Sequence, residues 1–142
     1  MLAKDLMSTS VVTLSPDNTV GEALETLVGK GISGVPVVEP PTAGGSGRIY
    51  GVLTEEDLLL YYEYPQECHM DVRLRDAKVL GAALITRGVI SVTPDTPAED
   101  VATLFIGRKI KRVPVVAGGK IVGILSRRDL LKGLLSLKKP GA

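Results

Sequence analysis

The hydrophobic pattern of the chain alternates between two kinds of stretch. Residues 35–38 and 121–125 are almost continuously apolar, which is typical of short strands that are buried on both faces. After Thr19 and after Thr96, apolar residues instead recur every three or four positions, which predicts amphipathic helices. This mixture of short strands and helices predicts an α/β (α+β) protein.

The whole pattern occurs twice along the chain. Pro36 lies in the sequence Val-Pro-Val-Val, and the same four residues recur 78 positions later around Pro114. Further on, Asp57 matches Asp129 with a separation of 72, so the first copy holds six additional residues. They belong to the Pro- and Gly-rich stretch 40–47, which predicts an exposed hairpin tip. Each copy reads as strand, helix, strand, strand, helix, with the first strands predicted at 11–14 and 89–92.

Four of the predicted helices begin with a capping-box pattern, in which a hydroxyl side chain is followed three residues later by a carboxylate. The pairs are Thr19 with Glu22, Thr54 with Asp57, Thr96 with Glu99, and Ser126 with Asp129. The second and fourth pairs directly follow a predicted strand. There, free N–H groups at the helix start could attract phosphate, and the Asp could accept the hydroxyls of a ribose. The alternative is that both Asp residues serve only as caps.

Composition and charge narrow the classes of function. The chain has no stretch long and apolar enough to span a bilayer and no signal-peptide pattern, so we expect a soluble, cytoplasmic protein. Cys68 is the only cysteine, which suits a reducing compartment, and Cys68 beside His69 is a poor candidate for a metal or catalytic pair.

Residues 1–64 carry three Lys/Arg against nine Asp/Glu, whereas residues 81–142 carry eleven against four. No nucleophile and base pair or metal cluster is visible, so we expect no enzyme.

In this order and in duplicate, these motifs resemble the cystathionine β-synthase (CBS) domain, which occurs in tandem as the Bateman module. The resemblance is carried by Gly31 to Val38, by the segment from Tyr50 to Leu58, and by the second set from Val122 to Leu130. It implies a pseudo-twofold pair of β-α-β-β-α repeats. The repeats would be residues 1–64 and 81–137, with a linker at 65–80 and a frayed tail at 138–142.

The resemblance also implies a function, namely a non-catalytic regulatory or sensor module that needs no cofactor. In the family, clefts between the repeats bind adenosine-containing ligands: AMP, ADP, ATP, S-adenosylmethionine or NAD-type molecules. For this chain we expect AMP, ADP or ATP ahead of S-adenosylmethionine or NAD-type molecules. Carried over residue by residue, the first site comprises Thr9, Val11, Ile32, Ser33, Pro36, Ser126 and Asp129. The second comprises Thr54, Asp57, Thr86, Val89, Ile110, Lys111, Arg112 and Pro114. Because Ser33-Gly34 in one repeat corresponds to Lys111-Arg112 in the other, we expect the Asp57 site to prefer the more phosphorylated ligand.

The expected partners are an adenine nucleotide, a second copy of the chain bound through the repeat helices, and an unidentified downstream protein. No membrane partner is expected. One alternative is a structural or protein-interaction module with vestigial clefts. Another is nucleic-acid binding through the basic second repeat, but the acidic first half and the scarcity of aromatic residues argue against it.

Overall fold

The computed structural model describes residues 1–40 and 47–137. The hairpin tip predicted at 40–47 falls mostly, and the frayed tail entirely, outside these residues. The chain divides into two compact units. The first-repeat unit is Val12–Val89, and the second-repeat unit combines Met1–Val11 with the described residues from Ile90 onwards. The predicted α+β fold class is confirmed, because each unit contains antiparallel strands and helices.

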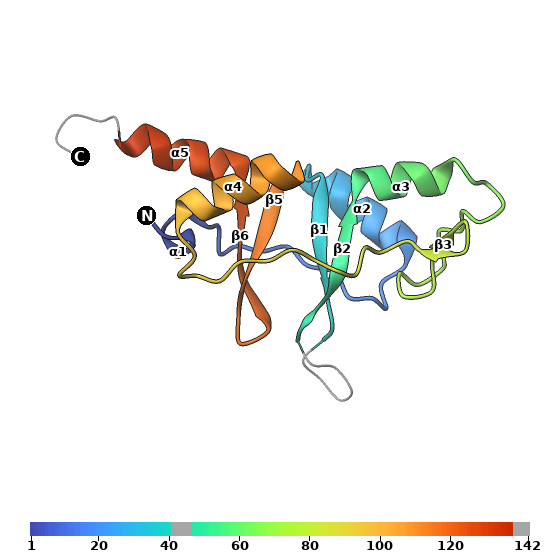
Figure 1. Ribbon diagram of the computed structural model, residues 1–142. Helices are drawn as coiled ribbons and strands as arrows, with labels where there is room; N and C mark the ends of the chain where they lie inside the picture. Colours follow the sequence, from blue (N-terminus) through green and yellow to red (C-terminus); the bar gives the residue numbers. More distant parts are fainter. Residues whose placement is uncertain (41–46, 138–142) are drawn as a thin grey trace. The chain divides into compact units, whose positions relative to one another are not determined.

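The first-repeat unit is built around a hairpin with two helices (Figure 1). Its elements are α2 (Val20–Lys30), β1 (Gly34–Val38), β2 (Ile49–Thr54), α3 (Glu55–Tyr62), β3 (Lys78–Val79) and β4 (Ala82–Ala83). Strands β1 and β2 are antiparallel, and Gly34 lies opposite Thr54. Two single residues extend this hairpin on its outer sides, since Leu14 bridges Val37 and Thr86 bridges Val52.

The second-repeat unit repeats this arrangement with residues from both ends of the chain. Its elements are α1 (Ala3–Leu6), α4 (Ala98–Arg108), β5 (Arg112–Ala117), β6 (Lys120–Ser126) and α5 (Arg127–Leu137). Strands β5 and β6 form the hairpin, Val92 bridges Val115, and Ser8 bridges Ile124. In both units, therefore, the segment that leads into one repeat pairs with the hairpin of the other repeat. We call these the lead segments, residues 1–11 for the first repeat and 81–89 for the second.

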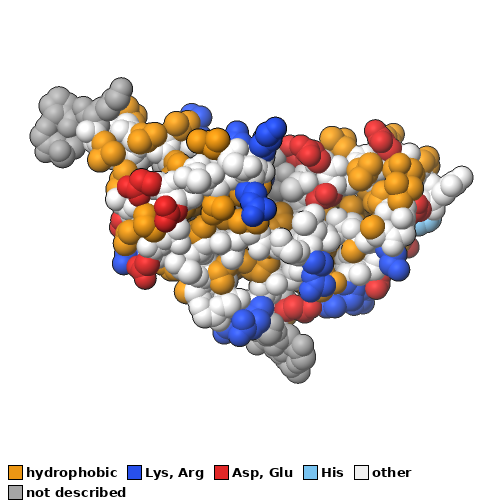
Figure 2. Space-filling view, viewed as in Figure 1, with side chains coloured by type: hydrophobic (Ala, Val, Ile, Leu, Met, Phe, Trp, Pro, Cys, Tyr) orange, Lys and Arg blue, Asp and Glu red, His pale blue; other side chains and the backbone are white. Residues whose placement is uncertain are grey.

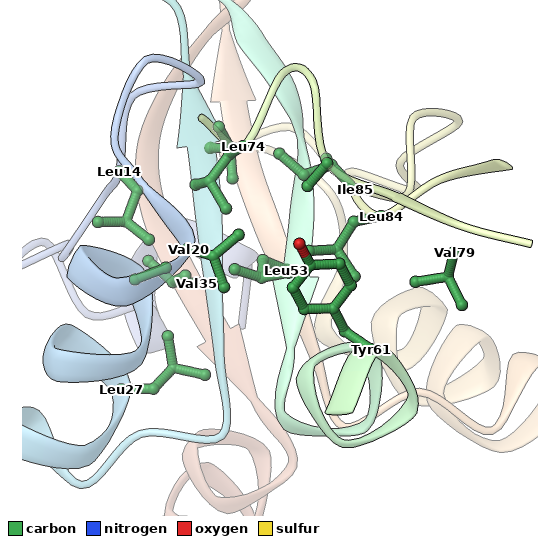
Figure 3. Close-up of a cluster of buried hydrophobic side chains, with 13 residues drawn as sticks. Leu14, Val20, Leu27, Val35, Leu53, Tyr61, Leu74, Val79, Leu84 and Ile85 are labelled. Carbon is green, nitrogen blue, oxygen red and sulfur yellow. The ribbon is translucent and has the colours of Figure 1, made fainter. Parts of the chain in front are cut away.

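The core of each unit is aliphatic, as the composition predicts. In the first-repeat unit, side chains from α2, β1, β2 and α3 converge on one cluster (Figure 3). Val35 and Leu53 are fully buried in it, and Tyr61 is its one buried aromatic residue among those described. Leu84 and Ile85, which belong to the lead segment of the second repeat, complete this cluster. The second-repeat unit has a smaller cluster around Val101, Phe105 and Leu125.

The segment predicted as a linker, 65–80, is packed onto the first-repeat unit. Leu74 is buried in the core, and its N–H donates to the carbonyl of Asn18 at 2.8 Å. The Arg75 side chain donates to Asp17 at 2.7 Å, and this bond lowers the pKa of the Asp17 carboxyl below its ordinary value. At the other end of the segment, the Tyr61 hydroxyl accepts from the N–H of His69 at 2.8 Å and donates to its carbonyl at 3.1 Å.

Local structure follows the predicted caps at three of the four helices. Thr19 and Glu22 form the predicted box, with bonds of 2.8 and 3.1 Å. The prediction for Thr96 is wrong, because helix α4 begins at Ala98 without a side-chain cap. The Thr96 hydroxyl instead accepts from the N–H of Thr93 at 3.0 Å, so a tight turn has taken the oxygen that the cap required.

The first strand predicted in each repeat is much shorter than expected. Residues 11–14 and 89–92 form no strand, and each contributes one bridging residue to its hairpin. In the first repeat, the N–H of Leu14 donates to the carbonyl of Pro36, and Leu14 in turn accepts from the N–H of Val38. Since Pro36 has no N–H of its own, pairing on this side is limited to these two bonds.

Candidate functional site

The first candidate half-site lies where β2 ends and α3 begins. The Thr54 hydroxyl accepts from the N–H of Asp57 at 3.2 Å and donates to Asp57 Oδ2 at 2.9 Å. The N–H of Thr54 donates to the same Oδ2 at 2.9 Å. The predicted capping box is therefore present, and it fixes the Asp57 carboxylate beside the helix start.

The second candidate half-site, at the junction of β6 and α5, has nearly the same geometry. The Ser126 hydroxyl accepts from the N–H of Asp129 at 3.2 Å and donates to Oδ2 at 2.9 Å, and the N–H of Ser126 donates to Oδ2 at 2.8 Å. Both Asp residues are partly exposed. The two repeats thus present the same group in the same local frame.

Capping uses one oxygen of each carboxylate. Among the described residues, the structure shows no hydrogen bond to Oδ1 of Asp57 or of Asp129, whereas Oδ2 accepts two bonds in each. An ionised carboxylate has about four acceptor positions, so capping does not exhaust it. Each Asp can therefore serve as a cap and still accept one or two hydroxyl groups of a ligand.

The lead segments bring further candidate residues to the same strands. In the first-repeat unit, Thr86 pairs with Val52, two residues before the Thr54 cap. In the second-repeat unit, Ser8 pairs with Ile124, two residues before Ser126, and Thr9 and Val11 follow it along the chain. Part of each predicted site is thus supplied within a single unit, by the cap and by the lead segment.

The remaining candidates lie at the starts of β1 and β5. The carbonyl of Ser33 accepts from the N–H of Glu55 at 2.9 Å, and that of Lys111 accepts from the N–H of Arg127 at 3.1 Å. Ile32 and Ser33 directly precede β1, and Pro36 lies within it. In the same way, Ile110 and Lys111 directly precede β5, and Arg112 and Pro114 lie within it. Each predicted site takes residues from both units, and its assembly remains a prediction.

Charge distinguishes the two strand starts within their own units. In the second-repeat unit, Arg112 lies opposite Ser126, and the Arg127 side chain donates to the carbonyl of Ile110 at 2.9 Å. Basic residues therefore gather beside the Ser126 cap. The equivalent place in the first-repeat unit has Gly34 opposite Thr54 and acidic residues at the start of α3.

Ser8 was not predicted from the sequence, yet it holds in its own unit the place that the predicted site residue Thr86 holds in the other. The residue that matches Thr86 in the other repeat is Ser8, 78 positions earlier, and both make the same pair of backbone bonds to a strand. The prediction named Thr9 in that repeat. Applying the repeat separation to Thr86 would have pointed to Ser8.

Other kinds of site find no support in the described ranges. Within residues 1–40 and 47–137, no group of three His, Cys, Asp or Glu side chains could hold a metal ion. Cys68 is partly buried and packs against the apolar core of the first-repeat unit. None of the helices described is long and apolar enough to cross a membrane.

Comparison with known proteins identifies the family. The family model described as CBS domain matches residues 3–64 and again residues 80–136, which together make up most of the chain. The chain belongs to the CBS-domain family. The two matches confirm that it carries a tandem pair of CBS domains.

Similar proteins cover nearly the whole CBS pair. The chain is 28% identical over 139 residues to the CBS domain-containing protein YhcV of Bacillus subtilis, a match that spans 98% of this chain and 89% of YhcV. It is 29% identical to the chloroplastic CBSX2 of Arabidopsis thaliana over 89% of this chain and 59% of that protein. The crystal structure of CBSX2 in complex with AMP superposes with a TM-score of 0.78, covering 97% of this chain and 98% of that one.

Proposed function

We propose that this CBS pair is a non-catalytic regulatory module that binds adenine nucleotides, with Asp57 and Asp129 accepting ribose hydroxyls. The observation that carries the proposal is the duplicated cap, which fixes an Asp after a strand and leaves one carboxylate oxygen without a bond among the described residues. CBSX2, which is similar over nearly the whole length of this chain, has been crystallised with AMP. AMP, ADP and ATP are therefore the first ligands to test, followed by S-adenosylmethionine and NAD-type molecules.

Isothermal titration of the wild-type chain with AMP tests this function directly. We expect saturable binding that is weakened by Asp57→Asn or Asp129→Asn and abolished by the double variant, because an amide can still cap the helix but is a poorer acceptor of hydroxyl groups. Glu22→Gln is the matched control, since Glu22 fills the same position of a capping box in α2. It should leave AMP affinity unchanged. If no adenosine ligand shifts the unfolding temperature at millimolar concentration, the chain is a structural or interaction module instead.

The two sites are proposed to differ in their preference for phosphate. The site predicted to contain Asp57 includes Lys111 and Arg112, which can give charge-assisted hydrogen bonds, whereas Ser33 and Gly34 are their uncharged counterparts. We expect Asp57→Asn to reduce ATP affinity more than Asp129→Asn does. An equal loss in both variants would contradict this assignment.

A homodimer through the helices is also proposed. Figure 2 shows hydrophobic side chains at the surface over α5 and over the part of the first-repeat unit that contains α3. The most exposed apolar residues of α2 and α4 are Val28, at 74%, and Ile106, at 80%, and they occupy equivalent repeat positions. A groove of about 440 Å³ between α2 and α3 is lined mainly by apolar side chains. Surfaces of this kind mark interaction sites.

Charge favours a head-to-tail pairing in this dimer, in which the first repeat of one copy packs against the second repeat of the other. In head-to-head pairing, each repeat would pack against the same repeat of the other copy. Helices α2 and α3 carry five Asp/Glu and one Lys, whereas α4 and α5 carry three Asp/Glu and four Lys/Arg. Val28→Cys and Ile106→Cys, each in a Cys68→Ser background, distinguish the arrangements. Head-to-tail pairing predicts a disulfide-linked dimer only when the two variants are mixed. Efficient crosslinking of either variant alone would show head-to-head pairing.

The partner and compartment complete the proposal. A regulatory module of this kind acts through a downstream protein, which the chemistry of the caps does not identify. The cytoplasm remains the expected compartment, since a lone cysteine suits a reducing environment.

A further inference from the structure

Each lead segment forms an antiparallel bridge with a strand, and the strand residue just before the bridge is a glycine. In the first-repeat unit, the N–H of Val52 donates to the carbonyl of Thr86 at 3.0 Å, and the N–H of Thr86 donates back to Val52 at 3.2 Å. In the second-repeat unit, Ser8 and Ile124 exchange the same two bonds at 2.8 and 2.9 Å. The residues that precede Val52 and Ile124 are Gly51 and Gly123, and both are buried.

A side chain at Gly51 would collide with the lead segment. A Cβ atom there would meet Ile85 Cγ2 and the carbonyl oxygen of Thr86, both closer than Cβ atoms come in real structures. This carbonyl is the one that accepts the hydrogen bond from Val52. A Cβ at position 51 therefore cannot coexist with the paired bonds, and the segment that carries Thr86 and Val89 must move.

Gly123 meets the equivalent segment, but mainly a flexible part of it. Its Cβ would lie 2.5 Å from Met7 Sδ, 2.9 Å from Met7 Cγ and 3.0 Å from the carbonyl oxygen of Ser8. The two closest contacts are with the Met7 side chain, which is flexible but has to repack, and the Ser8 carbonyl needs to shift by only a few tenths of an ångström. The same substitution should therefore disturb the second-repeat unit less than the first.

We propose that Gly51 and Gly123 are positioning residues for the two ligand sites. By lacking a Cβ, each glycine lets the lead segment of the opposite repeat lie against the strand that ends at the Thr54 or the Ser126 cap. The cap and the lead segment are thereby held on one strand, with the pairing two residues before the cap. This inference rests on the proposed function, because the segments and the caps supply the predicted ligand contacts.

Titration with AMP in single-site backgrounds tests the inference. In an Asp129→Asn background, which reports on the Asp57 site, Gly51→Ala should weaken AMP binding about tenfold or more, because the two bonds that hold the segment are lost. In the Asp57→Asn background, Gly51→Ala should leave Kd within about twofold. Gly123→Ala should show the reverse selectivity, with a smaller loss.

A general loss of stability would not be selective in this way, and two further variants separate the explanations. Met7→Ala should restore most of the AMP affinity that Gly123→Ala removes, whereas Ile85→Ala should not rescue Gly51→Ala, because the Thr86 carbonyl still obstructs position 51. Amide hydrogen exchange of Val52 should accelerate in Gly51→Ala.

The outcomes are distinct for the inference and for the function on which it rests. If wild-type protein binds AMP and Gly51→Ala binds it equally well at the Asp57 site, the positioning role is overturned and the proposed function stands. Equal losses at both sites in each glycine variant would also overturn it. If the wild-type chain binds no adenosine ligand, both proposals fail together.

Discussion

Replacing Tyr61 by Phe tests how the segment after α3 is held to the first-repeat unit. Tyr61 is 1% exposed, and its hydroxyl makes two hydrogen bonds to the backbone of His69. Phenylalanine keeps the ring and its packing but removes both bonds. A single Tyr→Phe change therefore isolates the contribution of the hydroxyl group.

The expected cost follows from what each bonding partner loses. A typical hydrogen bond contributes about 1 kcal/mol net, and an orphaned buried group costs about 1 to 3 kcal/mol. Because His69 is exposed, water can satisfy part of its freed backbone. We therefore expect Tyr61→Phe to lower the free energy of unfolding by about 1.5 kcal/mol, which would lower Tm by several degrees.

Urea unfolding monitored by circular dichroism measures this change. The midpoint concentration should fall while the m-value stays constant, since the surface exposed on unfolding is unchanged. Tyr62→Phe is the matched control, because Tyr62 is the next residue of α3 and is 73% exposed. A loss below about 0.5 kcal/mol for Tyr61→Phe, equal to that of the control, would refute the reasoning.

Three further predictions concern stability. Gly29→Ala and Gly107→Ala, at equivalent places in α2 and α4, should each raise the free energy of unfolding by about 0.5 to 1 kcal/mol in urea, since a Cβ there meets nothing within 4 Å; a loss would contradict the helix assignment. Thr19→Ala should lower stability by about 1 kcal/mol in the same assay, through loss of the cap; no change would contradict that cap. The hydrogen bond from Arg75 lowers the Asp17 pKa, so its contribution is present above the ordinary carboxyl pKa and disappears as pH falls through the lowered value. Asp17→Asn should therefore be less stable than wild type at pH 7, with a gap that narrows toward pH 3; a gap independent of pH would contradict this.

The parts of the fold that depend on neighbours in the sequence could be predicted. The caps at Thr54 and Ser126 need only a carboxylate three residues later, and both formed as expected. Gly31 ends α2 in the left-handed conformation, with φ of 63°, as a helix-ending glycine should. Thr96 shows the limit of such reasoning, because an equally local turn competed for its hydroxyl.

Features that depend on distant partners were harder to predict. Residues 65–80 were predicted to be a polar linker because their apolar residues follow neither a helical nor a strand pattern. In the structure, Leu74, Ala77 and Val79 are the buried hydrophobic residues of this stretch, and their spacings of three and two match no single regular element. Their attachment comes from nonlocal bonds, such as that from the N–H of Arg75 to the carbonyl of Pro16. For the candidate site, the sequence predicted both caps, but it could not show that Thr86 and Ser8 pair with the opposite hairpins.

The exchange of lead segments has a consequence for how the chain folds during synthesis. Every residue of the first-repeat unit lies in one continuous stretch, Val12–Val89, so this unit can close as soon as that stretch has left the ribosome. Residues 1–11 are made before this stretch, whereas their partner strand β6 is made after it. Ala3 and Leu6 therefore cannot reach their native packing until β6 has been translated, although the first-repeat unit can already be closed by then.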